Sequence, residues 1–210
     1  MPASPMTKYA NNDHYTDPKT GVLKNLLGIA TEAELEKAEA TFAGIRSYEL
    51  AQNPLEGNFD LDHLKAIHRT IFKDLYEWAG QCRDIDIAKG DNFFAHHVHI
   101  ETAAKAIFDK LAQEKYLAGL STADFCARAA YYFGEINALH PFREGNGRAQ
   151  REFISHLAYR NGYYIEWKNT DQDEMVGASI ASFKHGDTSK LAAILRANIR
   201  PLGKDEEAGA

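Results

Sequence analysis

The residues most able to do chemistry stand in one run, His140-Pro-Phe-Arg-Glu-Gly-Asn-Gly-Arg-Ala-Gln-Arg151. The run combines a histidine, a carboxylate, two glycines and three arginines, and it lies between two segments whose apolar residues recur with helical spacing. His140 is the only side chain of the run whose ordinary pKa lets it accept a proton near neutral pH. The run therefore predicts an anion-binding site that contains its own general base.

Gly145, Asn146 and Gly147 are predicted to hold the anion at the start of a helix. Unpaired backbone N–H groups and the positive end of the helix dipole favour negative charge there. Glycines let the backbone approach a phosphate closely, and Asn146 adds a side-chain amide. Nucleotide phosphates are the natural ligand of such a loop.

Three charged side chains complete the predicted site. Arg148 and Arg151 are three residues apart, so they project from one face of the helix and can fork onto phosphate oxygens. Glu144 is an oxygen donor suited to an Mg²⁺ ion that bridges the same phosphates. The charged side chains therefore predict a nucleotide whose phosphates are bridged by Mg²⁺.

The run resembles the signature of the Fic (Fido) family, His-x-Phe-x-(Asp/Glu)-Gly-Asn-Gly-Arg-x-x-Arg, and it matches every fixed position. Residues 61–80 resemble the family's helix that ends in Trp-Ala-Gly, and residues 83–94 resemble its β-hairpin, the flap. The similarity covers roughly residues 9 to 199. Within the family the chain is most similar to bacterial toxins that a separate antitoxin inhibits.

The resemblance implies a mainly α fold, a Fic-type helical bundle with a short β-hairpin flap over the active-site loop. It also implies transfer of AMP from ATP to a hydroxyl of a target protein, with His140 as the base. Glu144 would hold Mg²⁺, residues 145–147 would bind the α- and β-phosphates, Arg148 would reach the γ-phosphate and Arg151 the β-phosphate. Phe142 would be a buried anchor of the loop.

The flap is expected to bind the target. Apolar and polar residues alternate over 83–97, which is typical of a hairpin. A free strand edge would pair with the main chain of the target. The resemblance implies that Lys89 and Gly90 lie above the phosphates, and that Ile87, Phe93 and Phe94 contact the target.

Two other functions remain open on the sequence. The chain could be a Fic-fold module that docks a partner or regulates it, or a transferase of another nucleotide or of a phosphoryl group. Related phosphoryl-transferring kinases have Ala and Lys at the positions of Gly145 and Gly147, and this chain has both glycines. Their presence favours attack at the α-phosphorus.

Many Fic proteins inhibit themselves through the sequence (Ser/Thr)-x-x-x-Glu-(Gly/Asn). The nearest match here is Thr170 to Glu174, but Met175 stands where Gly or Asn is required. We therefore expect the inhibitory glutamate to come from a small helical antitoxin protein, which makes this chain the toxin of a toxin–antitoxin pair. Type IIA DNA topoisomerase subunits are one candidate target that the family resemblance offers.

Composition and charge disfavour several functional classes of protein. The formal net charge of −6 disfavours direct nucleic-acid binding, and no apolar run approaches the roughly 20 residues of a membrane span. The two cysteines lie beside apolar helical positions and are expected to be packing thiols. With no signal-peptide pattern, a bacterial cytoplasmic site of action is expected, and delivery into another cell stays open.

The predicted organisation is an arm of residues 1–30 that packs on the body, a Fic domain of residues 31–200 and a disordered tail of residues 201–210. Helices are expected after Thr31, after Asp60 as far as Gly80, from about 100 to 119, from 122 to 139, over the motif, after Asp171 and from about 188 to 199. Three clustered histidines, His96, His97 and His99, suggest a metal site only weakly. Because no Asp, Cys or His partner is indicated, solvated side chains are favoured.

Overall fold

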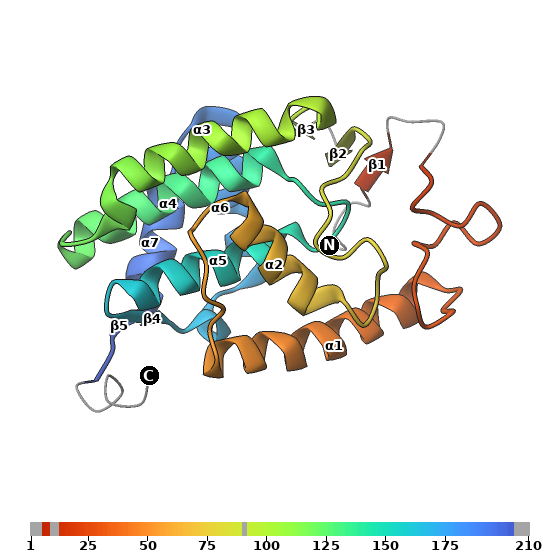
Figure 1. Cartoon of the computed structure of the whole chain (residues 1–210), viewed down its shortest axis with the longest axis horizontal. Helices are drawn as coiled ribbons and strands as arrows, with labels where there is room; N and C mark the ends of the chain where they lie inside the picture. Colours follow the sequence, from red (N-terminus) through yellow and green to blue (C-terminus); the bar gives the residue numbers. More distant parts are fainter. Residues whose placement is uncertain (1–5, 9–12, 90–91, 204–210) are drawn as a thin grey trace.

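Seven α-helices and five short strands make up the part of the chain that the structure, a computed structural model, describes: residues 6–8, 13–89 and 92–203 (Figure 1). The helices are α1 (Glu32–Gln52), α2 (Leu61–Phe72), α3 (Ile100–Gln113), α4 (Thr122–Leu139), α5 (Asn146–Arg160), α6 (Gln172–His185) and α7 (Ser189–Asn198). The strands are β1 (Met6–Lys8), β2 (Ile87–Lys89), β3 (Asn92–Phe93), β4 (Tyr163–Ile165) and β5 (Ile199–Pro201). The predicted mainly α fold with a hairpin is confirmed.

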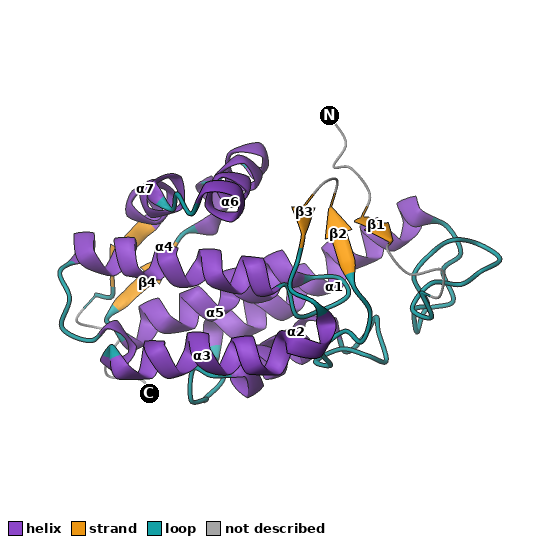
Figure 2. Cartoon of the chain, turned by 90° about the horizontal axis from the view of Figure 1, so that it is seen from above, coloured by secondary structure: helices purple, strands orange, loops and turns teal. Residues whose placement is uncertain are grey.

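Helix α4 is the centre of the bundle. It packs against α3 and α5 and also against α6 and α7, which lie together on its other side in Figure 2. Phe125, Tyr132 and Phe133 are at most 1% exposed, so apolar side chains leave α4 on several sides. At its start the Ser121 hydroxyl caps the helix by accepting a hydrogen bond from the Asp124 N–H at 3.2 Å. The C-terminal end of α4, where the motif begins, is therefore fixed from all sides.

The motif helix α5 is covered by α2, and α2 is covered in turn by α1. Asp60 caps α2 by accepting the His63 N–H at 2.8 Å. Four apolar side chains of α2 are completely buried at this interface and in the core beside it: Leu64, Ile67, Ile71 and Phe72. Helix α1 lies outermost, and one of its side chains, Glu39, contacts Arg148 at the start of α5.

The flap is part of a three-stranded antiparallel sheet with the order β1-β2-β3. Thr7 pairs with Ala88 on one side of β2, and Phe93 pairs with Ala88 on the other side. The predicted free edge is therefore wrong for β2, because the N-terminal arm already occupies it. Figure 2 shows this sheet beyond the ends of α3 and α4.

The end of helix α2 differs from the expected one. Helix α2 ends at Phe72 and not near Gly80, and turns follow it. Gly80 has a φ of +80°, and its N–H donates to His68 Nδ1 at 2.9 Å. A Cβ at residue 80 would lie 2.7 Å from the Arg69 Cβ, so glycine is required where the chain folds back on α2.

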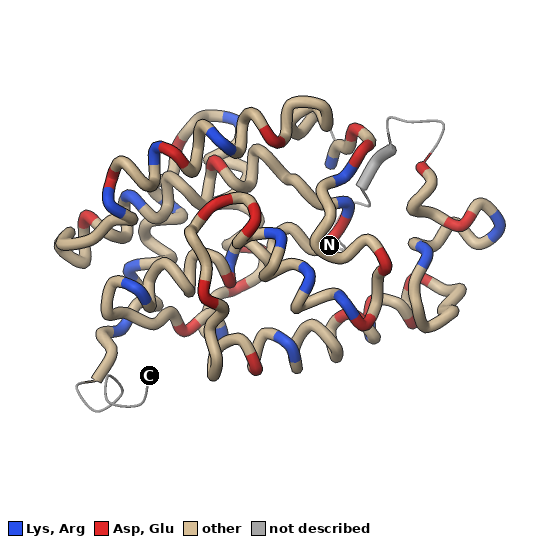
Figure 3. The backbone as a smooth tube through the Cα atoms, in the orientation of Figure 1, with Lys and Arg blue, Asp and Glu red and all other residues tan. Residues whose placement is uncertain are grey.

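The C-terminal end is ordered further than predicted. Pro201, which was assigned to a disordered tail, pairs with Tyr163 in the β4–β5 sheet, and Leu202 donates its N–H to the Gly162 carbonyl at 2.9 Å. The rest of the predicted tail, residues 204–210, lies outside the described residues. Acidic and basic residues are both spread along the chain (Figure 3). No described helix is long and apolar enough to cross a membrane.

Candidate active site

His140 ends α4 in a left-handed backbone conformation, with φ 46° and ψ 61°. Its N–H donates to the Ile136 carbonyl at 3.0 Å, which closes the last turn of the helix. A non-glycine residue in this conformation costs free energy and persists only where the surroundings hold it. Arg83 holds this backbone, because it donates hydrogen bonds to the carbonyls of His140 and Pro141. These bonds fix the position of the predicted base.

The His140 ring has one defined tautomer. Nδ1 lies 3.2 Å from the Asn137 carbonyl oxygen, which can only accept, so Nδ1 carries the proton and Nε2 keeps its lone pair. Burial lowers the pKa of His140 to about 3, and the positive charges of Arg83 and Lys89 act in the same direction. A neutral imidazole with a free Nε2 is the form that a general base requires.

Phe94 covers the base. Its ring stacks on the His140 ring with centroids 3.7 Å apart and an interplanar angle of 14°, and it contacts Phe183 of α6 edge-on. The flap therefore contacts the predicted base itself and not only the space above it. Phe94 remains a predicted target contact, and in this conformation it lies against His140.

Arg83 is a functional residue that the sequence analysis missed. It is 2% exposed, and its guanidinium donates to the carbonyls of His140 at 2.8 Å, Ile85 at 2.7 Å and Ala95 at 2.5 Å. Its own N–H donates to the Pro141 carbonyl at 2.8 Å. One side chain thus joins both legs of the flap to the backbone of the base. The sequence offered one signal for this role: Arg83 stands at the start of the segment in which apolar and polar residues alternate.

The motif loop is closed from inside by Asn146. Its side chain accepts the Phe142 N–H at 2.9 Å and donates to the Phe142 carbonyl at 2.8 Å. This amide therefore closes the loop, and since its NH₂ group has a second N–H, the prediction that it binds phosphate stays a prediction. The backbone N–H groups of Asn146 and Gly147, at the start of α5, have no acceptor among the described residues and remain available to an anion.

Phe142 and His68 fix the loop from below. Phe142 is completely buried, as expected, and stacks on His68 with centroids 3.8 Å apart. Because His68 Nδ1 accepts from Gly80, its Nε2 donates to the Glu144 carbonyl at 3.0 Å. Burial lowers the pKa of His68 to about 3, so it is a neutral core histidine and not a second base.

The two glycines of the loop have different reasons to be glycine. Gly145 has a φ of +79°, and a Cβ there would lie 2.3 Å from the Phe72 ring. Gly147 has space, because its Cβ would meet only Arg151 Nη1 at 3.8 Å. Gly145 is therefore required by packing, which the sequence analysis did not foresee, and only Gly147 is left to phosphate approach.

Glu144 is half-buried at the mouth of the loop. Its Oε1 accepts the Gly145 N–H at 2.9 Å, and Oε2 has no hydrogen-bond partner among the described residues. Burial, with the nearby Glu39 charge, raises the pKa of Glu144. A bound cation would offset that cost, so the donor set fits one carboxylate ligand of an Mg²⁺ whose other ligands are phosphates and waters.

The two motif arginines are in different states. Arg148 pairs with Glu39 of α1, with Nη2 2.5 Å from Oε2, and Glu39 also accepts the Tyr76 hydroxyl. Arg151 has no ion pair within the described ranges, and burial lowers its pKa. The chain therefore supplies a glutamate to the first motif arginine and leaves the second one available. Glu39 lies outside the inhibitory pattern that was searched for, so the sequence did not indicate it.

One cavity of about 450 Å³ brings most of the predicted residues together. It is lined by the predicted residues Lys89, Phe94, His140, Glu144, Gly145, Asn146, Gly147, Arg148 and Arg151, by Phe133, Asn137 and Gln150, and by Met175, Val176, Ser179, Ile180 and Phe183 of α6. The α6 wall is mostly apolar, which the sequence analysis did not anticipate. A cavity with one charged end and one apolar end fits a nucleotide.

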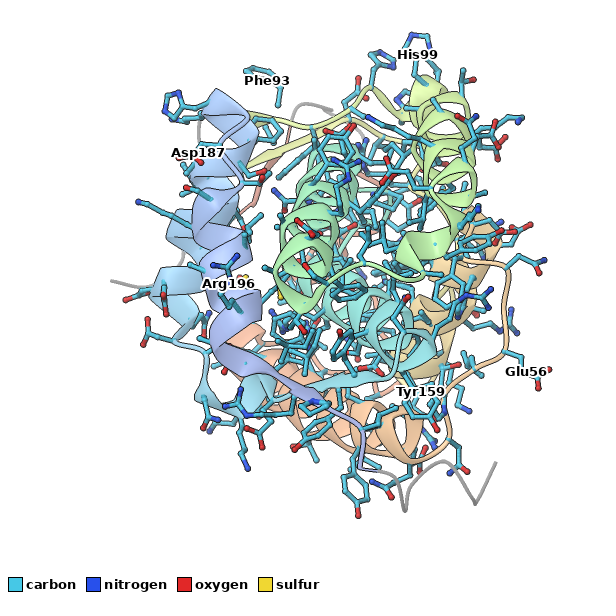
Figure 4. All side chains as sticks on the ribbon, turned by 90° about the vertical axis from the view of Figure 1, so that its left-hand side faces the viewer. Glu56, Phe93, His99, Tyr159, Asp187 and Arg196 are labelled. Carbon is cyan, nitrogen blue, oxygen red and sulfur yellow. The ribbon has the colours of Figure 1, made fainter. Side chains whose placement is uncertain are left out.

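Two predicted flap residues do not line this cavity. Ile87 is 4% exposed and packs with Tyr15 and Ile85, so its predicted target contact is wrong for the side chain. Phe93 is 57% exposed and points away from the body of the molecule in Figure 4, where a partner can reach it. Gly90 lies outside the described residues.

Comparison with known proteins shows which family this chain resembles. Residues 58–158 match the sequence model of the Fic/DOC family. Protein adenylyltransferase VbhT of Bartonella schoenbuchensis is 51% identical over 195 residues, which are 92% of this chain but 41% of VbhT, so the chain spans less than half the length of that relative. A probable protein adenylyltransferase Fic of Escherichia coli K12 is 37% identical over 92% of this chain and 96% of its own length.

A solved structure extends the agreement to the fold. The BepC protein of Bartonella tribocorum, a VirB-translocated effector with bound AMPPNP, superposes with a TM-score of 0.84 at 28% identity, over 90% of this chain and 97% of BepC. The match to the E. coli protein covers nearly the whole of both chains. This chain belongs to the Fic/DOC family.

Proposed function

We propose that this chain is a nucleotidyltransferase that moves AMP from ATP to a hydroxyl side chain of a target protein. The observation that carries the proposal is that a neutral His140 lines the same cavity as the free start of α5, Glu144 and two arginines. The names of relatives at 37–51% identity, which are protein adenylyltransferases, support it. The AMPPNP bound to BepC supports ATP as the donor.

The triphosphate is placed at the charged end of the cavity. The N–H groups at the start of α5 and the side chains of Arg148 and Arg151 would neutralise it. The apolar wall of α6, with Met175 and Ile180, would receive the nucleobase. Bound through Glu144, Mg²⁺ would supply charge neutralisation between the phosphates.

The transfer itself is an in-line displacement. The target hydroxyl oxygen attacks the α-phosphorus, the bond from that phosphorus to the bridging oxygen breaks, and pyrophosphate leaves. His140 Nε2 takes the hydroxyl proton. The protein contributes position and charge and forms no covalent bond with the nucleotide.

We place the flap over the incoming target. Since β1 occupies one edge of β2, the target would pair at the edge of β3 or displace β1. Phe93, exposed at that edge, would contact the target first, and Phe94 would hold the modified residue beside His140.

The proposed biological setting is a toxin of a toxin–antitoxin pair that acts in the bacterial cytoplasm. Arg151, which has no ion pair among the described residues, supports it, because a small helical antitoxin could supply the glutamate that pairs there. The similarity to VbhT and to a translocated effector keeps delivery into another cell open. Type IIA topoisomerase subunits are the first targets to test.

The decisive experiment compares the parent protein with His140→Ala, using ATP labelled at the α-phosphate and a bacterial lysate. We expect the parent to label a target only with Mg²⁺ or Mn²⁺ present, and the variant to lose about 10²- to 10⁴-fold in rate while it still binds ATP. Residual activity within tenfold of the parent would remove His140 from the role of base. A phosphorylated target with release of ADP would show that the γ-phosphoryl group is transferred instead.

A further inference from the structure

A second possible metal site lies at the base of the flap, outside the nucleotide cavity. Asp86 stands directly before β2, and His96 and His97 follow β3 after two residues. One donor atom from each side chain lies within 4.8 Å of the other two. The sequence analysis set a metal aside because no partner for the histidines was indicated, and that premise is wrong, since the hairpin brings Asp86 to them.

The carboxylate of Asp86 is shared between the two histidines. Its Oδ1 is 2.9 Å from His97 Nδ1, and its Oδ2 is 3.1 Å from His96 Nε2. Two imidazoles and one carboxylate are the donor set of many Zn²⁺ sites and of other transition-metal sites. Three protein ligands leave at least one coordination position for water.

The carboxylate is also held in place from behind. The His97 backbone N–H donates to Asp86 Oδ1 at 2.8 Å, and Arg83 Nη1 lies 3.9 Å from the same oxygen. Such contacts fix the orientation of a ligand before the metal arrives. At metal–ligand bonds of about 2.0–2.2 Å, donors of one ion lie within about 4.4 Å of one another. The donor atoms here lie within 4.8 Å of one another. Rotation of the His96 side chain, which is 54% exposed, can bring its nitrogen within the distance that one ion requires.

We propose that Asp86, His96 and His97 bind one transition-metal ion of the Zn²⁺ class and that this ion clamps the two legs of the flap. Each histidine coordinates through the nitrogen that now faces Asp86, and the proton on that nitrogen leaves or moves to the other ring nitrogen. The clamp lies two residues from Phe94, which stacks on His140. Metal occupancy therefore sets how firmly the flap is held. This inference does not depend on the identity of the transferred group.

The test is calorimetric titration of the tag-free protein with Zn²⁺, in buffer with excess Mg²⁺ and without nucleotide. We expect one ion per chain, and at least about tenfold weaker binding in His96→Ala and in His97→Ala. His99→Ala is the matched control, because His99 projects from the same segment (Figure 4) but its donor atoms are not in the cluster. Glu144→Gln should bind Zn²⁺ like the parent, which separates this ion from the Mg²⁺ of the nucleotide site.

A second readout follows the flap directly. Zn²⁺ should slow amide hydrogen exchange in residues 84–97 of the parent, chelator should reverse the effect, and His96→Ala should abolish it. The proposal is overturned if Zn²⁺ shows no saturable binding, if His99→Ala weakens binding as much as His96→Ala, or if the flap exchanges at the same rate with and without the ion.

Discussion

The motif loop and the flap meet at His140, yet they are held in very different ways. The loop is fixed from within by Asn146, from below by His68 and from the side by a buried ion pair between Arg143 and Asp13 at 2.9 Å. The two flap strands have three and two residues, and at the end of the hairpin Phe93 is exposed. The flap is tied to the body at its base, by Arg83, and through the stacking of Phe94 on His140.

This difference matches a division of labour. Phosphate chemistry requires groups held to a fraction of an ångström, because a displacement of about 1 Å can cost about 100-fold in rate. A surface that accepts a protein segment must instead admit it and then close. Arg83 is where the two requirements meet, since it binds the carbonyl of the base and both legs of the flap.

Gly145→Ala should have the largest effect, because it disturbs the motif loop, the more firmly held of the two regions. The new methyl group would overlap Phe72 in a backbone conformation that favours glycine. We expect a loss of about 1–3 kcal/mol in the free energy of unfolding and at least about a 100-fold fall in transfer. Thermal melting and a transfer assay measure the two losses.

Gly147→Ala is the matched control for that substitution. Residue 147 has room for a methyl group, so the melting temperature of this variant should stay near that of the parent. Its ATP binding should weaken, because the methyl group hinders the approach of the phosphates. If both variants melt alike, the packing role of Gly145 is wrong.

Arg83→Lys should give the next largest effect, because it loosens the link between the two regions. Lysine keeps the charge but cannot reach three carbonyl groups with a planar fork. We expect turnover to fall about 10- to 100-fold, while the dissociation constant of ATP stays within about threefold. Equal losses in turnover and in ATP affinity would mean that Arg83 only supports the fold.

Glu39→Gln should have a smaller effect and of the opposite sign. The Glu39 carboxylate neutralises Arg148 before any phosphate arrives, so its removal should tighten ATP binding by about 3- to 10-fold. Glutamine can still accept the Tyr76 hydroxyl. Glu36→Gln removes the same charge from an exposed position of α1 and should leave the affinity unchanged. If the two variants bind ATP equally, the ion pair does not compete with nucleotide.

Local patterns predicted much of this molecule because their physics is local. The helices expected after Asp60 and Asp171 begin at those residues, because each aspartate accepts a backbone N–H from two or three positions further on. The motif resemblance located the cavity, because glycines, base and arginines are contiguous in the chain.

Contacts between distant segments could not be read from the same patterns. Glu39 and Arg148 are 109 residues apart, and nothing in the spacing of α1 distinguishes Glu39 from its acidic neighbours. Asn146 was assigned to phosphate because its side chain is polar, and only the folded loop reveals that the same side chain also bonds both backbone groups of Phe142. The N-terminal strand on the flap was missed for the same reason, since β1 and β2 are far apart in the chain.

The smallest expected effect is that of pH on the base. Burial lowers the pKa of His140 to about 3, so the deprotonated form that accepts the hydroxyl proton persists well below neutral pH. Turnover per ATP-bound enzyme should therefore change less than about twofold between pH 8 and pH 6, measured with ATP binding checked at each pH. A histidine with the ordinary value of about 6.5 would be about three-quarters protonated at pH 6 and would lose about fourfold in rate. A fall of that size centred near pH 6.5, with ATP binding unchanged, would mean that the flap does not keep Phe94 on His140 in the working enzyme. The environment of His140 would then depend on the flap and not on the fixed motif loop.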